Sequence, residues 1–63
     1  MKNKLKEYRE KKQLSQTELA YKTGVSQRYI AFLEAGQRTP SLKLASRIAL
    51  VLNSKVDRIF LPK

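Results

Sequence analysis

Residues 15 to 36 read SQTELAYKTGVSQRYIAFLEAG, and this stretch predicts two short helices joined by a tight turn. Ser15 stands three residues before Glu18, which is the spacing of a capping box. In this motif the hydroxyl and the carboxylate each bond a backbone N–H that the first turn of a helix leaves free. Gly24 then ends the first helix, because glycine adopts the left-handed conformation without steric strain.

The second helix of this stretch combines an apolar face with an outward face. Ser26 is its N-cap candidate, we expect the helix over 27–35, and Gly36 ends it. On a helical wheel the packing side carries Tyr29, Ile30 and Leu33, and the other side carries Gln27, Arg28, Ala31 and Phe32. Two helices of about eight residues joined by a short glycine turn are typical of a helix-turn-helix.

The outward side of the second helix has residues that can recognise bases. Gln27 and Arg28 lie in the first turn, where a recognition helix meets base edges in the major groove. Glutamine pairs with adenine, and arginine with guanine, through two hydrogen bonds. Phe32 lies one turn beyond Arg28, and we expect it to be exposed and to touch a thymine methyl group or a sugar. These three are the predicted base-reading residues, and a merely solvated helix face is the alternative for Gln27 and Arg28.

Length and composition limit the classes of protein. A chain of 63 residues buries only about 60% of its unfolded surface, so we expect a single domain over 1–63 without a large catalytic cleft. The sequence has no cysteine and no histidine, so we expect no metal site, no cofactor and no enzymatic activity. It has no apolar run of membrane-spanning length, and we expect neither a membrane span nor a secretory leader. We therefore expect a cytoplasmic protein with no membrane partner, located at the nucleoid when bound to DNA.

The charge of the chain favours a polyanionic partner. Fourteen lysines and arginines against five acidic residues give a formal net charge of +9. Such an excess attracts nucleic acids and anionic membranes alike, so charge alone does not separate DNA, RNA and membrane. Lysines that only keep a small protein soluble are the alternative.

The remaining sequence predicts further helices and no strands, because the alternation of apolar and polar residues that strands need is missing. Further helices are expected over about 3–12 and over 56–60. Another is expected to end at about Leu52, and its start is marked by Thr39, Pro40 and Ser41. Asn53 is a plausible left-handed stop. The expected fold is all-α, a compact five-helix domain.

Four segments together resemble one known family. They are LSQTELA, GVSQRYIAFLEAG, TPSLKLASRIALVL and VDRIF, in this order and at the usual spacings of the phage-repressor, Xre-type or Cro-like, helix-turn-helix DNA-binding proteins. The resemblance covers about residues 5–60. It implies a five-helix phage-repressor-like fold, with the helix-turn-helix formed by helices two and three, and double-stranded DNA as the partner.

The resemblance also implies roles for individual residues. Residues at positions where the family contacts backbone phosphates are Gln16, Ser26, Arg38, Thr39 and Lys43. The resemblance also implies that Gln16 braces the next helix. Arg9 and Glu34 match a pair that forms an ion bridge between the first and third helices of many relatives. Phe32 is a departure, because its position is more often polar in the family. Ser54 and Lys55 also depart, since relatives usually have a hydroxyl cap and then an apolar residue there, so we expect a frayed fifth helix.

Leucines at polar positions of the family pattern predict a dimer surface. Leu44 and Leu50 in the fourth helix, and Leu61 beyond the fifth, give the C-terminal surface more apolar area than a lone domain needs. A weak homodimer through this surface is one interpretation. A slightly fuller core is the other, because Leu44 and Leu50 do not lie on one helical stripe.

The function that these features predict is a sequence-specific double-stranded DNA-binding transcriptional regulator, a repressor that acts as a dimer on an inverted-repeat operator. A phage or mobile-element repressor, a restriction-modification controller and an antitoxin with a cognate toxin as partner are narrower possibilities that the sequence does not separate. The main alternative is a protein-interaction module that keeps the fold without specific DNA binding. A membrane-active or RNA-binding basic peptide is a further alternative. Helices interrupted every eight to twelve residues argue against a helix that lies on a membrane surface.

Overall fold

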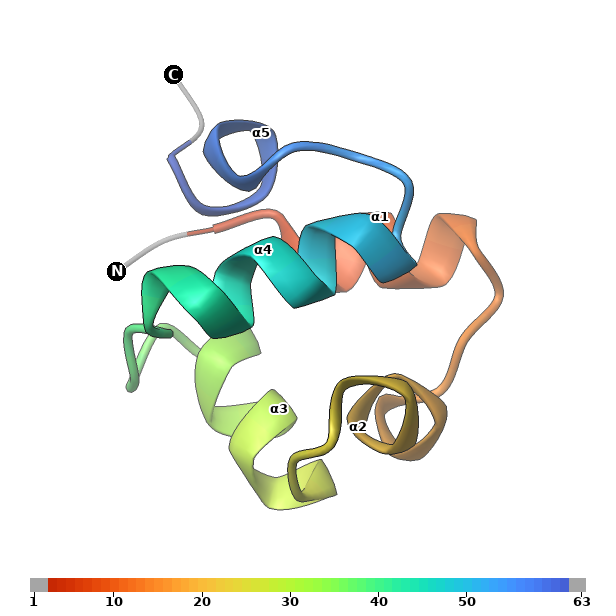
Figure 1. Cartoon of the computed structure of the whole chain (residues 1–63). Helices are drawn as coiled ribbons and strands as arrows, with labels where there is room; N and C mark the ends of the chain where they lie inside the picture. The colour runs from red at the N-terminus through yellow and green to blue at the C-terminus, as the bar shows by residue number, and fades with distance from the viewer. Residues whose placement is uncertain (1–2, 62–63) are drawn as a thin grey trace.

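The computed structural model describes residues 3–61, and within them the chain forms helices and turns without a strand. The helices are α1 (Leu5–Lys11), α2 (Gln16–Thr23), α3 (Gln27–Glu34), α4 (Leu42–Val51) and α5 (Val56–Phe60). Helix α4 crosses the middle of the molecule, with α5 on one side and α2 and α3 on the other (Figure 1). The expected all-α, five-helix fold is confirmed.

Serine hydroxyls begin three of the helices. Ser15 Oγ accepts from the backbone N–H of Glu18 at 3.0 Å, and Glu18 Oε1 accepts from the Ser15 N–H at 2.9 Å, which completes the predicted capping box. Ser26 and Ser41 accept a backbone N–H in the same way at the starts of α3 and α4. Helix α4 therefore begins at Leu42, after the proline rather than around it.

Four helices are followed, within two residues of their last residue, by a residue with a positive φ angle. These residues are Gln13, Gly24, Gly36 and Asn53. The glycines and Asn53 were expected stops. Gln13 was not an expected stop. Helix α1 ends at Lys11 instead of the predicted Lys12, and the N–H of Gln13 donates to the carbonyl of Glu10 at 2.9 Å.

Helix α1 begins at Leu5, two residues later than the sequence predicts. Asn3 lies outside the helix because its side chain is used in two hydrogen bonds. Its Oδ1 accepts from the Leu5 N–H at 3.0 Å, and its Nδ2 donates to the carbonyl of Leu33 in α3 at 2.7 Å. The Lys4 N–H donates to the carbonyl of Ile59 at 2.8 Å, so the start of α1 is joined to both α3 and α5.

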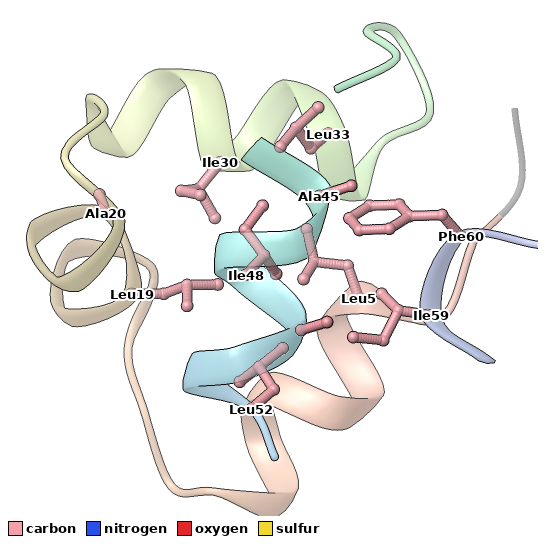
Figure 2. Packing of buried hydrophobic residues seen from close by; sticks show 11 residues of the cluster. Leu5, Leu19, Ala20, Ile30, Leu33, Ala45, Ile48, Leu52, Ile59 and Phe60 are labelled. Atoms are coloured by element: carbon pink, nitrogen blue, oxygen red, sulfur yellow. The ribbon is translucent and has the colours of Figure 1, made fainter. Parts of the chain in front are cut away.

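The core is built from apolar side chains of all five helices, gathered around α4 (Figure 2). Leu5, Leu19, Ile30, Leu33, Ile48 and Ile59 are fully buried. Burying one such side chain stabilises the fold by about 1.5–3 kcal/mol, so this cluster holds α3 at a fixed position on the surface.

Candidate nucleic-acid interface

The turn between α2 and α3 is held from both sides. The buried Thr23 donates its hydroxyl to the carbonyls of Leu19 at 2.7 Å and Ala20 at 3.3 Å. Arg47 of α4 donates from Nη1 to the carbonyl of Thr23 at 3.2 Å. Gly24 follows with φ +77°, a conformation that other residues rarely adopt. These contacts fix the direction in which α3 leaves the turn.

Helix α3 presents its first turn to solvent. Gln27 and Arg28 are exposed, while Ile30 and Leu33 have no exposed surface. Tyr29 is half-buried and packs against the core. The predicted division of this helix into a packing face and an outward face is therefore present.

Phe32 is less exposed than the wheel predicts. It is half-buried, although it is not among the side chains that pack against the described core. Long side chains of a helix lie back over the preceding turn, so part of the ring is covered by its own helix. Its assignment as a base-contacting residue stays a prediction.

A row of hydrogen bonds runs inward from the exposed end of α3. Gln27 Nε2 donates to Gln16 Oε1 at 2.6 Å. Gln16 Nε2 in turn donates to Glu34 Oε1 at 3.0 Å. The first turn of α2 therefore touches both ends of α3, and Gln16 has one amide N–H left for a phosphate.

The row ends at a buried ion pair between α1 and α3. Arg9 Nε lies 2.6 Å from Glu34 Oε2, and the two side chains are only 10% and 6% exposed. Arg9 Nη2 also donates to Glu34 Oε1 at 3.3 Å, and Nη1 donates to the carbonyl of Leu14 at 2.6 Å. The hydrogen bond to Glu34 raises the pKa of the Arg9 guanidinium, against the opposing effect of burial. The ion pair implied by the family resemblance is present in the structure, and its partners are buried.

We refer to Gln27, Gln16, Glu34 and Arg9 as the polar relay. The sequence predicted a base reader, a phosphate contact that also braces the next helix, and a structural ion pair, without connecting the four side chains. Helical spacing does not connect them, because they belong to three helices. Only the packing of α1 and α2 against α3 brings the four side chains together.

The other predicted phosphate-contacting residues lie beside both ends of α3. Arg38 and Thr39 are exposed in the loop that follows the helix, and Ser26 is exposed at its N-cap. Lys43 is exposed in the first turn of α4 and lines a shallow hollow with Val25 of the turn. The exposed end of α3 is therefore bordered by cationic and hydroxyl side chains.

Arg47 and Asn3 are structural supports of this surface that sequence reasoning missed. Arg47 follows Lys43 by one helical turn and lines the same hollow, so a search for basic residues at i, i+4 spacing finds it. Asn3 has the weaker signal of an amide residue just before a helix. Its partner, the carbonyl of Leu33, is 30 residues away in the sequence.

The predicted apolar surface divides into two parts. Leu44 is half-buried and packs against the core, as the fuller-core interpretation requires. Leu50 and Leu61 are 81% and 64% exposed. Leu42, which the sequence did not single out, is 76% exposed. It lines an apolar groove between α4 and α5 together with Leu61.

The described residues hold neither a membrane-length apolar helix nor a cluster of three or more residues of the metal-binding types.

Known proteins share this arrangement. A family model described as Helix-turn-helix matches residues 5–59. An uncharacterized HTH-type transcriptional regulator of Archaeoglobus fulgidus is 48% identical over 61 residues, which cover 97% of this chain and 86% of that protein. The chain belongs to the helix-turn-helix family of transcriptional regulators. The resemblance to the Xre-type proteins is confirmed, and the relatives are DNA-binding regulators rather than enzymes.

Two solved structures of this family match the fold. The restriction-modification controller protein C.AhdI from Aeromonas hydrophila superposes with a TM-score of 0.81 at 34% identity, covering 87% of this chain and 83% of that chain. SinR of Bacillus subtilis, the master regulator for biofilm formation, was solved in complex with DNA. It superposes with a TM-score of 0.76 at 34% identity, covering 82% of this chain and 84% of that chain.

Proposed function

We propose that this helix-turn-helix protein is a sequence-specific repressor that binds an inverted-repeat operator as a dimer, with α3 in the major groove. The observation that carries the proposal is the exposure of Gln27 and Arg28 on the first turn of a helix whose other face carries the fully buried Ile30 and Leu33. A helix held in this way can enter the groove without disturbing the core.

The residues around α3 position the protein on the duplex. Arg38, Thr39, Lys43 and Ser26 contact backbone phosphates, and so does the free N–H of Gln16. Such contacts hold the register of the protein without reading the sequence. Because each neutralised phosphate contributes about −0.9 to the slope of log affinity against log salt, binding weakens steeply as salt rises.

The dimer forms through the surface that carries Leu61 and its neighbour Leu42. Both side chains are largely exposed and border one apolar groove, which Pro40 of the α3–α4 loop also lines. This surface adjoins the loop that carries Arg38 and Thr39, two of the proposed phosphate contacts. Sedimentation that stays monomeric up to high micromolar concentration contradicts the homodimer.

The test is selection of bound duplexes from a random DNA pool at near-physiological salt. An enriched inverted repeat with half-site centres about 10–10.5 bp apart, or a multiple of that, is the expected result. Measurable binding with no enriched motif overturns the proposal. It favours the protein-interaction module, whose partner, such as a cognate toxin, then occupies the groove of Leu42 and Leu61.

Two variants separate reading from positioning. Arg28→Ala removes a contact to a base edge, so it weakens the selected operator by about 1–3 kcal/mol and relaxes one base position. Lys43→Ala removes a contact to a phosphate, so it weakens all duplexes alike and reduces the salt slope by about 0.9. Equal losses on every duplex for both variants contradict the assignment of Arg28.

A further inference from the structure

The polar relay has only one chemically allowed order of atoms. Its inner end is the Glu34 carboxylate, which accepts hydrogen bonds and has no hydrogen to donate. The atom of Gln16 that faces Glu34 must therefore be the donor Nε2, at 3.0 Å. Gln16 Oε1 then points to the other side, where it accepts from Gln27 Nε2 at 2.6 Å. A carboxylate at one end thus decides the orientation of two amides.

The inner end of the relay cannot turn. Glu34 Oε2 is held by Arg9 Nε at 2.6 Å, and Oε1 receives Arg9 Nη2 at 3.3 Å. The carboxylate side chain is 6% exposed, so water does not replace these partners readily. Reversing the Gln16 amide places its oxygen against a carboxylate oxygen, which loses a charge-assisted hydrogen bond and adds repulsion.

The outer end of the relay is the amide that faces DNA. Gln27 uses one N–H on Gln16 and keeps its Oε1 and its second N–H in a defined order. Adenine offers an N6 donor beside an N7 acceptor in the major groove, whereas guanine offers two acceptors, O6 and N7. An amide with a fixed acceptor beside a donor matches adenine and opposes the O6 of guanine.

We propose that Glu34, held by Arg9, is a positioning residue for base reading, which fixes the Gln27 amide in the order that selects adenine over guanine. The inference rests on the proposed function and adds a specificity role to a residue that touches no DNA. An ion pair that only joins α1 to α3 has no influence on base preference. Through the polar relay, the Arg9–Glu34 pair influences which base Gln27 prefers.

Glu34→Gln is the sharpest test, because it keeps the size of the side chain and changes one atom from acceptor to donor. The oxygen of the new amide faces Arg9 Nε, the nearer donor at 2.6 Å, and gives up the longer contact with Arg9 Nη2 at 3.3 Å. The NH2 group then faces Gln16. Gln16 then reverses to accept with Oε1, and its Nε2 faces Gln27. The reversed relay presents Gln27 with its N–H groups toward the base, in the wrong order for adenine.

The experiment measures binding of purified full-length chains to the selected operator and to the same duplex with guanine at the Gln27 position. The position that Gln27 reads is identified with Gln27→Ala, which loses its base preference at that one position of the operator and keeps it elsewhere. For the wild-type chain we expect adenine to be preferred by about 5- to 150-fold, the range for a bidentate base contact. For Glu34→Gln we expect that preference to fall at least about tenfold or to invert. Glu7→Gln, the same change at an exposed carboxylate of α1, leaves it unchanged.

A second variant keeps the test independent of folding. Arg9→Met/Glu34→Leu replaces the ion pair with apolar side chains of similar volume, an exchange that is often neutral or stabilising. It removes the acceptor of Gln16, so the adenine preference falls while circular dichroism shows a folded protein. In the Gln27→Ala background neither change in the ion pair alters base preference further, because the reading amide is gone.

The outcomes separate the two proposals. In one outcome, Gln27→Ala loses the base preference at one position of the motif, but both ion-pair variants keep that preference within about twofold. This outcome overturns the role of the relay and leaves the proposed function standing. A preferred base other than adenine at that position also overturns the relay. Absence of any motif for the wild-type chain overturns both proposals.

Discussion

Helices α2 and α3 are defined by their own ends, whereas α1 and α5 are defined by their neighbours. Each helix of the turn motif begins at a serine that accepts a backbone N–H and is followed by a glycine with positive φ. The N-cap residues of α1 and α5 are Lys4 and Lys55, and neither side chain accepts a hydrogen bond from the first turn of its helix. Helices α2 and α3 therefore have local structural signals at both ends, and the starts of α1 and α5 depend more on tertiary contacts.

The largest effect is expected where the two kinds of element meet, at the ion pair between α1 and α3. Glu34→Ala leaves the Arg9 guanidinium in a site where its side chain is only 10% exposed and without its carboxylate. Breaking a buried pair in this way costs about 3–5 kcal/mol, a large part of the stability of a small domain. Urea unfolding followed by circular dichroism measures the loss.

The double variant Arg9→Met/Glu34→Leu is the control for that prediction. Because no unpaired charge remains, it recovers most of the stability lost in Glu34→Ala. A loss below about 1 kcal/mol for Glu34→Ala means that the pair behaves like an exposed surface pair, which contradicts its burial.

The same contrast explains which parts of the fold could be predicted. The bounds of α2, and the serine caps and glycine stops of the turn motif, follow from residues within a few positions of each other. The bounds of α5 were also predicted correctly, but from its apolar residues and not from a cap. The start of α1 did not follow, because Asn3 is held by a carbonyl of α3. Its end at the left-handed Gln13 was also missed, since glutamine is not a residue that usually signals such a stop.

The candidate site divides in the same way. The exposure of Gln27 and Arg28 follows from helical periodicity, which is a local property. The contact of Gln16 with both Gln27 and Glu34 depends on how α2 packs against α3. The spacing of Arg47 from Lys43 marks it as a second basic residue of α4, but its partner is a backbone carbonyl, which the side-chain pattern does not show. Periodicity predicts which face is outward, and only the packing shows which side chains act together.

A smaller effect tests the local signals of the turn motif. Ser26→Ala removes the hydroxyl that accepts the Tyr29 N–H at 3.1 Å. Loss of an N-cap of this type costs about 1 kcal/mol of stability. Denaturant unfolding measures it, and Ser26→Asp, which restores an acceptor, recovers most of the loss. An unchanged midpoint for Ser26→Ala shows that α3, like α1, is held by its neighbours alone.

The complementary prediction gives α5 the local signal that it lacks. Lys55 has φ −120° and ψ 150°, the extended conformation of an N-cap, but no side-chain cap bond. Lys55→Ser supplies an acceptor and stabilises the protein by about 0.5–1 kcal/mol. Lys4→Ser is the matched control, because Lys4 has φ −110° and ψ 21° and is not in the capping conformation. Equal gains for both variants contradict the importance of that backbone conformation.

The smallest effect concerns pH and the cap of α2. Hydrogen bonds from the backbone N–H of Ser15, and then from its hydroxyl, lower the pKa of the exposed Glu18 carboxyl below its usual value. A carboxyl whose pKa is lower in the folded state binds fewer protons there, so its contribution is present above the unfolded pKa. It is lost as the pH falls through the folded pKa.

Glu18→Gln isolates this contribution, because glutamine also completes a capping box and does not titrate. Between pH 7 and pH 3 the wild-type chain is expected to lose more stability than the variant, measured as the shift in urea midpoint at each pH. Ser15→Ala keeps the larger cause, the backbone N–H, so it retains much of the pH dependence. Identical pH profiles for wild type and Glu18→Gln would mean that the start of α2, like that of α5, gains nothing from a charged cap.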